Sequence, residues 1–233
     1  MRIFFIFSSL ICFFLSKANC DVKILYTSAL IPYKFEERKH EYIHSLNILE
    51  KYGYKDKTYV VESGPNTSFS FFGAYCDHVF YADTNDASLR NKGVNEAKAC
   101  LAALSHYDFD EEDILIKLTG RYFFNNDRFI HLVESHPEVD VFVAPRQVHG
   151  CVPVQEVGVF NCGVTTGCLA MRCKYFKQML EDLDLEKMEK NLIDIESEVE
   201  WFVQNMILQG KNVVCLDKIG LTANVANGRI VQW

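Results

Sequence analysis

Two cations in the stretch ILIKLTGRY, from Ile114 to Tyr122, are spaced in a way that suits the binding of an anion. Lys117 and Arg121 are four residues apart, on either side of a Thr-Gly break. Because an arginine fork makes bidentate contacts with phosphate or carboxylate, this pair predicts contact with such a group. The alternative interpretation is a surface salt bridge with the acidic run from Asp110 to Asp113.

The apolar residues before Lys117 predict a buried strand that ends at Gly120. Short apolar runs bounded by turn signals are typical of such strands, and glycine lets the backbone turn sharply or approach a ligand closely. In open α/β sheets, ligands bind outside the carboxyl ends of the strands. This position favours a binding site at Arg121 and leaves the salt bridge as the alternative.

Asn91, Lys92 and Gly93 stand immediately before a predicted helix. The backbone N–H groups at a helix N-terminus favour anions, and Lys92 adds a positive charge, so this segment is a second candidate for phosphate contact. A capped helix start, with Asn and Gly in a turn, explains the same residues without a ligand.

A third group of candidates is acidic and lies at or near the start of a later helix. Glu196 and Glu200 share one face of that helix, whereas Glu198 faces elsewhere. A carboxylate in this position can serve as a general base. The alternative is an acidic first turn, with Asp194, that the helix dipole favours.

Strands and helices alternate along the chain and predict an α/β fold. The early connections carry no hairpin signal, which favours βαβ units and a mostly parallel sheet flanked by helices in a single domain. Residues 145–162 show little pattern, and loops of this length are often functional. The predicted strands are residues 22–28, 57–62, 79–81, 114–118, 139–144, 167–171 and 213–216, and the predicted helices are residues 36–52, 93–106, 126–134, 174–183 and 196–208.

The net charge and the motifs that the sequence lacks argue against several classes of protein. A formal net charge of −7 argues against a general binder of nucleic acid or of anionic membranes, although it permits a local basic pocket. The sequence has no G-x-S-x-G, H-E-x-x-H, P-loop or G-x-G-x-x-G motif. These absences weigh against hydrolase, zinc protease, kinase and dehydrogenase functions.

The N-terminus predicts export. Arg2 precedes an uncharged, mostly apolar run from Ile3 to Leu15, and the small residues Ser16 and Ala18 follow. Since a transmembrane helix needs about 20 residues, this pattern is typical of a cleaved signal peptide rather than of a stable membrane span. We expect a signal peptide at 1–20, a folded domain at 21–233, and a location in a secretory-pathway lumen, a periplasm or the extracellular space. In such a compartment some of the cysteines are expected to form disulfides.

The early strands and the helix start NKGVNEA from Asn91 to Ala97 resemble the nucleotide-binding half of GT-A type glycosyltransferases. The segment GVTTGCLAMR from Gly163 to Arg172 is similar to their acceptor-side strand, and Ile195-Glu196 to their helix-borne acidic motif. The stretch KLTGRY resembles a mark of a set of glycosyltransferase-like proteins. The resemblance covers about residues 22–218, and its matches are loose except for KLTGRY. It implies a GT-A-like, Rossmann-like sheet and a nucleotide-sugar donor.

The resemblance also implies roles for individual residues. A nucleotide-sugar would lie over the strand ends, and Glu196 would deprotonate an acceptor hydroxyl. The residues expected near the base and ribose are Thr27, Ser28 and Glu62, those expected to face phosphate are Asn91, Lys92 and Arg121, and further candidates for nucleotide contact are Asp83 and Asn85.

One departure from the family concerns metal binding. GT-A enzymes usually hold a divalent ion through a D-x-D motif at the end of the strand that carries KLTGRY here, and no D-x-D stands there. The resemblance therefore implies either a metal-independent enzyme or an inactive relative. In the first case Lys117, Arg121 or both would offset the charge of the diphosphate, and no metal or other cofactor is expected.

These observations lead us to expect a glycosyltransferase-like protein that transfers a sugar from a nucleotide-sugar to a hydroxyl of a glycan, lipid or protein acceptor. The alternative is an exported, non-catalytic protein on the same fold that binds a glycan or a partner surface. A nucleotidyltransferase is a third interpretation, although no Gly-rich basic loop supports triphosphate binding. No interaction with nucleic acid is expected.

Overall fold

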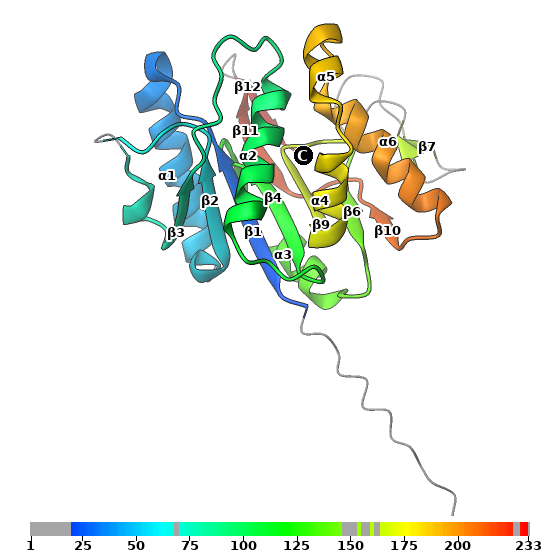
Figure 1. Ribbon diagram of the computed structural model, residues 1–233. Coiled ribbons are helices and arrows are strands. Elements are labelled where there is room, and N and C mark those ends of the chain that lie inside the picture. Colours follow the sequence, from blue (N-terminus) through cyan, green and yellow to red (C-terminus); the bar gives the residue numbers. More distant parts are fainter. Residues whose placement is uncertain are drawn as a thin grey trace, which may run out of the picture.

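The computed structural model describes residues 20–67, 70–145, 153–154, 159–160, 164–225 and 229–232. Within these ranges, seven strands form one central sheet (Figure 1). They are β1 (Val22–Ser28), β2 (Thr58–Glu62), β3 (His78–Tyr81), β4 (Ile114–Thr119), β6 (Val141–Val143), β9 (Cys168–Arg172) and β10 (Val213–Cys215). Their order is β10-β6-β9-β4-β1-β2-β3, and all neighbouring pairs are parallel except those that β9 makes with β4 and β6.

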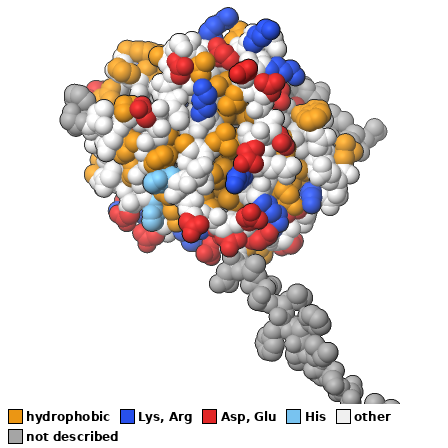
Figure 2. Space-filling model, viewed as in Figure 1, with side chains coloured by type: hydrophobic (Ala, Val, Ile, Leu, Met, Phe, Trp, Pro, Cys, Tyr) orange, Lys and Arg blue, Asp and Glu red, His pale blue; other side chains and the backbone are white. Residues whose placement is uncertain are grey.

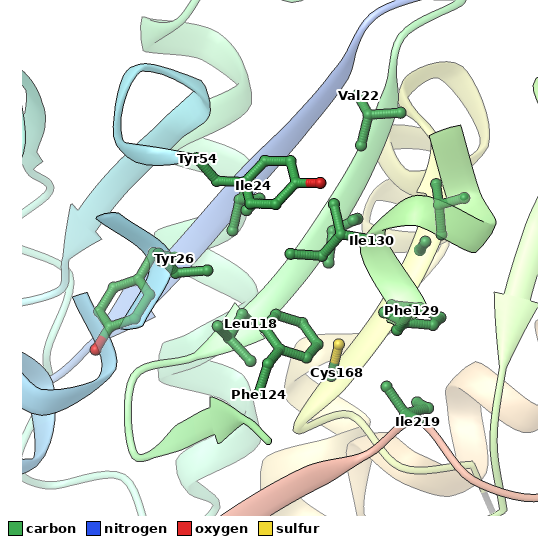
Figure 3. Packing of buried hydrophobic residues seen from close by; sticks show 14 of the residues in the cluster. Val22, Ile24, Tyr26, Tyr54, Leu118, Phe124, Phe129, Ile130, Cys168 and Ile219 are labelled. Atoms are coloured by element: carbon green, nitrogen blue, oxygen red, sulfur yellow. The ribbon is translucent and has the colours of Figure 1, made fainter. Parts of the chain in front are cut away.

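Helices cover both faces of this sheet, so that a hydrophobic core lies on each side of it. One face is covered by α1 (Phe35–Lys51) and α3 (Arg128–Ser135), and the other by α2 (Lys92–His106), α4 (Cys173–Glu181) and α6 (Ile195–Leu208) (Figure 1). The short α5 (Leu185–Asn191) joins α4 to α6, and three 3₁₀ helices are η1 (Pro32–Lys34), η2 (Lys55–Lys57) and η3 (Phe72–Ala74). Figure 3 shows the first core, in which Ile24, Leu118 and Ile130 lie close together.

The alternation of side chains along β4 explains how the candidate residues are placed. Ile114, Ile116 and Leu118 enter the core beneath α1 and α3. Because successive strand residues point to opposite faces, Leu115 and Lys117 point toward the layer of α2, α4 and α6. On the surface of that layer, acidic and basic side chains are interspersed (Figure 2).

A smaller antiparallel sheet lies beside α1. Its order is β12-β11-β5, formed by β5 (Tyr122–Phe124), β11 (Leu221–Val225) and β12 (Arg229–Gln232), and β7 (Pro153–Val154) pairs separately with β8 (Val159–Phe160). The sequence patterns predict neither these five strands nor α5. The reason is that β5 directly follows the break after β4 and takes its partner from a distant part of the chain, which no local pattern signals.

The predicted fold class is confirmed: the chain is α/β, with a mostly parallel sheet flanked by helices. Each predicted strand and helix is present, and its ends differ from the prediction by no more than two residues. Two details differ. The strand predicted at 167–171 is antiparallel to its neighbours, and the strand predicted at 213–216 is followed by two more.

The predictions about export fall mainly outside the described residues. Residues 1–19 lie there, so the signal peptide and the exported location stay predictions. Among the described residues, no helix has the length and apolar character needed to span a bilayer. Disulfides remain a prediction for Cys151 and Cys162, which lie outside the described ranges, whereas the thiols that are not in disulfides include Cys20, Cys76, Cys100, Cys168 and Cys173.

Candidate functional site

A buried ion pair between Glu96 and Lys117 lies at the carboxyl end of β4. The Nζ of Lys117 is 2.7 Å from Glu96 Oε1 and 2.7 Å from Thr119 Oγ1. It also donates to the carbonyl oxygen of Thr166. These three acceptors match the three protons of an ammonium group, so the charge of Lys117 is bound within the protein.

Glu96, on α2, gathers further donors around the same oxygen. The hydroxyls of Thr27 and Thr119 each donate to Glu96 Oε1 at 2.9 Å. The Glu96 side chain is 24% exposed, against 5% for Lys117, so the cluster reaches the surface on the side of Glu96. We call Thr27, Glu96, Lys117, Thr119 and Thr166 the Glu96 cluster.

Electrostatic interactions keep both members of the pair charged. Burial alone would raise the pKa of Glu96, but the adjacent Lys117 charge outweighs it, and the pKa lies below its ordinary value. Burial alone would lower the pKa of Lys117, but Glu96 more than reverses this, and the pKa lies above its ordinary value. The strand end therefore carries a fixed pair of opposite charges.

Glu196 is joined to the Glu96 cluster through Thr166. It lies in the first turn of α6, which begins there because Asp194 Oδ1 accepts a hydrogen bond from the backbone N–H of Ser197 at 2.9 Å. The hydroxyl of Thr166 donates to Glu196 Oε1 at 3.2 Å. Within the described ranges no group donates to Glu196 Oε2, and the residue is half-buried. One oxygen is thus held in place and the other is available to accept a proton.

Tyr122, on β5, stands among these charges. Its ring lies against Gly167, where an added Cβ would be 2.6 Å from the ring carbons. Burial raises the pKa of Tyr122, and charges of both signs act on its hydroxyl. The phenol is therefore within electrostatic range of the cations Arg121 and Lys117 and of the carboxylates Glu96 and Glu196.

Gly120 turns the chain so that Arg121 lies on the α1 side of the strand end. An added Cβ at Gly120 would be 2.7 Å from the ring of Tyr42 and 2.9 Å from the ring of Tyr26, so only glycine fits without a shift. Arg121 lines a surface hollow beside α1. No hydrogen bond or ion pair from another described residue holds its guanidinium, so its charge is available to a ligand.

The salt-bridge interpretation of Lys117 and Arg121 is wrong. Asp110 to Asp113 lie at the amino end of β4, and the whole strand separates them from these cations. Asp113 instead pairs with Lys23 of the neighbouring strand.

Ser28 and Glu62 form a buried network on the opposite face of the sheet from Thr27. Glu62 Oε2 accepts from Ser28 Oγ at 2.7 Å, and Oε1 accepts from the backbone N–H groups of Leu30 and Gly64 at 2.9 Å each. Burial raises the pKa of Glu62. Both carboxylate oxygens are engaged, so Ser28 and Glu62 shape the loops after β1 and β2. Their contact with a base and ribose stays a prediction.

Asp83 and Asn85 lie in an exposed loop after β3. Asp83 has a positive φ of 50°, which is uncommon for a residue other than glycine. The backbone N–H of Asn85 donates to the carbonyl oxygen of Ser63 at 2.9 Å, and its Oδ1 accepts from Asn95 Nδ2 at 3.2 Å. These bonds hold the loop at the carboxyl end of the sheet, where a nucleotide contact was expected.

Asn91 caps α2, and its side chain is used within the protein. Its Oδ1 accepts from the backbone N–H of Gly93 at 3.0 Å. Its Nδ2 donates to the carbonyl oxygens of Met188 at 3.1 Å and of Ile193 at 2.7 Å. The capped helix start, which was the alternative interpretation, is what the structure has.

A carboxylate of the protein occupies the position where a phosphate was expected at the start of α2. Glu189 accepts from the backbone N–H groups of Arg90 and Asn91 at 2.9 Å each, and these bonds hold the pKa of Glu189 below its ordinary value. The Nζ of Lys92 donates to the carbonyl oxygen of Leu89 at 2.7 Å. Asn91 and Lys92 therefore make contacts within the chain, and their contact with a phosphate stays a prediction.

Of the predicted residues, Thr27, Lys117 and Glu196 come together, whereas Arg121 lies on the α1 side of the same strand end. Sequence reasoning missed the residue that unites them, Glu96. One signal was available: a lone lysine inside a buried strand requires a buried partner of opposite charge. Sequence reasoning also assigned no role to Thr119, Tyr122 or Thr166.

The strand end where GT-A enzymes hold a metal does not fit a divalent ion here. The ammonium of Lys117 and the hydroxyl of Thr119 stand at this position, and the carboxylate beside them, Glu96, is already paired with Lys117. Divalent ions such as Mg²⁺ prefer oxygen ligands that carry negative charge. Across the residues that the structure describes, no group of three or more His, Cys, Asp or Glu side chains is arranged to hold a metal.

No protein-family model and no curated protein matches the chain. Solved structures match it in fold. A protein assigned as a glucose-1-phosphate thymidylyltransferase from Bacillus anthracis, in complex with a sucrose, is 13% identical with a TM-score of 0.58, over 89% of this chain and 92% of that chain. A 4-diphosphocytidyl-2C-methyl-D-erythritol synthase is 13% identical with a TM-score of 0.51, over 92% of this chain and 94% of that chain.

A glycosyltransferase involved in the glycosylation of the major capsid of PBCV-1 is 12% identical with a TM-score of 0.48, over 84% of this chain and 81% of that chain. The two likenesses above a TM-score of 0.5 concern the fold and agree with the architecture described above. The chain has a GT-A-like, Rossmann-like α/β fold.

Proposed function

We propose that the chain is a glycosyltransferase that moves a sugar from a nucleotide-sugar donor to a hydroxyl acceptor without a divalent metal. One observation carries this proposal. The Glu96–Lys117 pair stands at the end of β4 and is joined through Thr166 to a second carboxylate, Glu196. Ligands bind at this edge of an open α/β sheet, so these charges are placed where a reacting group would lie.

Glu196 is the proposed general base. Thr166 holds one of its oxygens, and no described group donates to the other. A carboxylate held in this way takes the proton from the acceptor hydroxyl as that oxygen attacks the sugar carbon. The bond between the sugar carbon and the diphosphate oxygen breaks in the same step, and the nucleoside diphosphate leaves.

Arg121 is proposed to offset the charge of the leaving diphosphate. Its guanidinium has no partner among the described residues, lies close enough to influence the pKa of Tyr122, and has the fork geometry that suits phosphate. Lys117 contributes a positive potential at the same edge but no direct bond, because its three protons are bound. Thr27, Asp83 and Asn85 are the residues proposed to lie near the nucleotide.

A nucleotidyltransferase is the second candidate, because both solved structures above a TM-score of 0.5 are named for thymidylyl or diphosphocytidyl compounds. Such an enzyme binds a triphosphate and needs cations near the strand ends. In this chain the segment after β1, residues 29–34, offers Lys34 alone as a cation and contains no glycine. We therefore favour the glycosyltransferase.

The test is a thermal-shift panel on residues 21–233 with UDP, GDP, CMP, their common sugar conjugates and the nucleoside triphosphates, each with Mn²⁺ and with EDTA. A ligand that binds only the folded state, at about 100 times its dissociation constant, adds roughly 2.7 kcal/mol to the free energy of unfolding. Stabilisation by a nucleotide-sugar that persists in EDTA is the expected result.

Three other results would count against the proposal. Stabilisation that requires Mn²⁺ would contradict the metal independence. Stabilisation by a triphosphate alone would favour the nucleotidyltransferase. A panel without any shift would favour the non-catalytic binding protein on this fold.

A further inference from the structure

A hollow of about 210 Å³ lies on the α1 side of the candidate site. It is open to the surface between α1 and β5, and the hydroxyl of Ser45 holds these two elements together by donating to the carbonyl oxygen of Tyr122 at 2.6 Å. The hollow is lined by Glu41, His44, Arg121 and Phe123.

Two rings form one wall of this hollow. Phe123 is half-buried, and its ring centre is 4.6 Å from that of His44, with the ring planes at 88°. This edge-to-face contact fixes both rings, which therefore offer a rigid apolar surface next to an exposed imidazole. Ligand pockets combine such apolar surfaces with a few polar groups that fix the orientation of the ligand.

The polar wall is a carboxylate held in a neutral pair. Glu41 Oε2 is 3.2 Å from an Nη1 of Arg38, and the two side chains are 11% and 8% exposed. No described residue donates to Glu41 Oε1, which is left as an acceptor for an O–H group. Glu41 lines the hollow, so this open acceptor points to a ligand that carries hydroxyls.

We infer that this hollow binds a single uncharged sugar ring. Its hydroxyls bond to Glu41 and His44, and its apolar C–H face lies on Phe123. The volume is below the roughly 300–1,000 Å³ that is usual for drug-sized ligands, which suits one ring rather than a lipid chain. The Arg38–Glu41 pair is neutral, and Arg121 is assigned to the diphosphate, so the remaining lining favours a sugar without charge.

In the proposed reaction this ring belongs to the acceptor. That identification rests on the proposed function, whereas the binding of a sugar does not. The two are tested separately, because the sugar is titrated in the absence of any nucleotide.

The experiment is an NMR titration of the ¹⁵N-labelled protein with glucose, galactose, mannose, xylose, fucose, N-acetylglucosamine and glucuronate. At least one neutral sugar is expected to shift the backbone amide signals of residues 41–44 and 121–123 in a saturable way. Phe123→Leu is expected to weaken this binding by about 2–10-fold, the loss of an aromatic contact. His44→Ala, at an exposed position that folding tolerates, is expected to weaken it as well.

Tyr175→Leu is the matched control, because Tyr175 is half-buried as Phe123 is. It lies on α4 close to Arg172, whose side chain bonds to Glu112 before the amino end of β4, away from the hollow. Its binding of the sugar is expected to equal that of the unaltered protein. The inference is overturned if no sugar shifts the amide signals of these residues. It is also overturned if Tyr175→Leu weakens binding as much as Phe123→Leu, or if glucuronate binds at least about tenfold more tightly than every neutral sugar, a difference of about 1.4 kcal/mol.

Discussion

The carboxylate of Glu96 and the ammonium of Lys117 lie 2.7 Å apart, one on helix α2 and the other on strand β4. The pair stands at the carboxyl end of β4, carries both signs of charge and is neutral as a whole. Because the lysine protons are all bound within the protein, Lys117 acts through its potential and through the groups that it holds in place.

Replacing Lys117 by methionine is expected to lower the free energy of unfolding by about 3 kcal/mol, because Glu96 would be left without its counter-charge. The measurement is urea denaturation of the variant and of the unaltered protein. Adding Glu96→Gln to Lys117→Met should recover part of the loss, since the unpaired charge is then gone. Equal stabilities of the single and the double variant would contradict the pairing.

Low pH is expected to lower the free energy of unfolding, because Glu96 then takes up a proton. Its pKa is lowered in the folded protein, so the unfolded chain takes up the proton at higher pH than the folded chain does. The contribution of Glu96 to stability is therefore complete above the ordinary value of about 4.3 and is lost as the pH falls through the folded value. Unfolding free energies of the unaltered protein and of Glu96→Gln, measured from pH 7 to pH 3, should converge as the pH falls. A constant difference would show that this carboxylate is not the one responsible.

Replacing the carboxyl group of Glu62 by an amide is expected to preserve the stability of the fold, whereas removing the group is expected to lower it. Glu62→Gln keeps an oxygen for the N–H groups of Leu30 and Gly64, whereas Glu62→Ala leaves them buried without an acceptor. Each unsatisfied donor costs about 1–3 kcal/mol. Because burial raises the pKa of Glu62, ionisation of this group lowers the free energy of unfolding as the pH rises through the folded pKa. The stability of Glu62→Gln relative to the unaltered protein should therefore be most favourable at neutral pH. Denaturation curves of both variants at pH 4 and pH 7 check this, and equal losses would rule out the network.

Gly167→Ala is expected to displace the ring of Tyr122, because the new Cβ would lie 2.6 Å from it. Overpacking of this kind typically destabilises by about 1–3 kcal/mol. Combining it with Tyr122→Ala removes the clash, so the two effects should not add. Strict additivity in a double-mutant cycle of unfolding free energies would mean that the ring does not rest on this glycine.

Glu196→Gln is expected to lower kcat of sugar transfer by at least about 100-fold while the affinity for the donor stays unchanged. The amide cannot accept the proton of the acceptor hydroxyl, although it still fits the hydrogen bond from Thr166. Release of nucleoside diphosphate measures the rate, and thermal shift measures donor binding. Glu198→Gln is the control, since Glu198 lies on another face of α6. A similar loss in both variants would remove Glu196 from the role of base.

The sheet was predictable from the sequence because its elements carry strong local patterns. The apolar run of β4 and the helical spacing of Val94, Ala97 and Leu101 on α2 each indicate one type of element. The mostly parallel pairing follows from the absence of early hairpin signals together with the preference for parallel crossover units, whereas the order of the strands was not predicted.

The site was predictable only in part. Thr27 and Ser28 are expected near one ligand, but adjacent strand residues point to opposite faces, and the structure places Thr27 with Glu96 and Ser28 with Glu62. The contact of Glu96 with Lys117 joins a helix to a strand, and no spacing rule within one element reveals it. The hydrogen bonds that Asn91 Nδ2 donates to the carbonyl oxygens of Met188 and Ile193 join segments about a hundred positions apart, which only the folded structure brings together.

The pairing of β5 with β11 also determines when the candidate site is completed during synthesis. Phe124 pairs with Leu221, which follows it by 97 positions. A ribosome that adds about 5–20 residues per second needs roughly 5–20 s to make that interval. During this time β1, β2, β3 and β4 already exist, but Tyr122 has no strand partner. Contacts between such distant positions form slowly, so Tyr122 is expected to be among the last residues to reach its folded position.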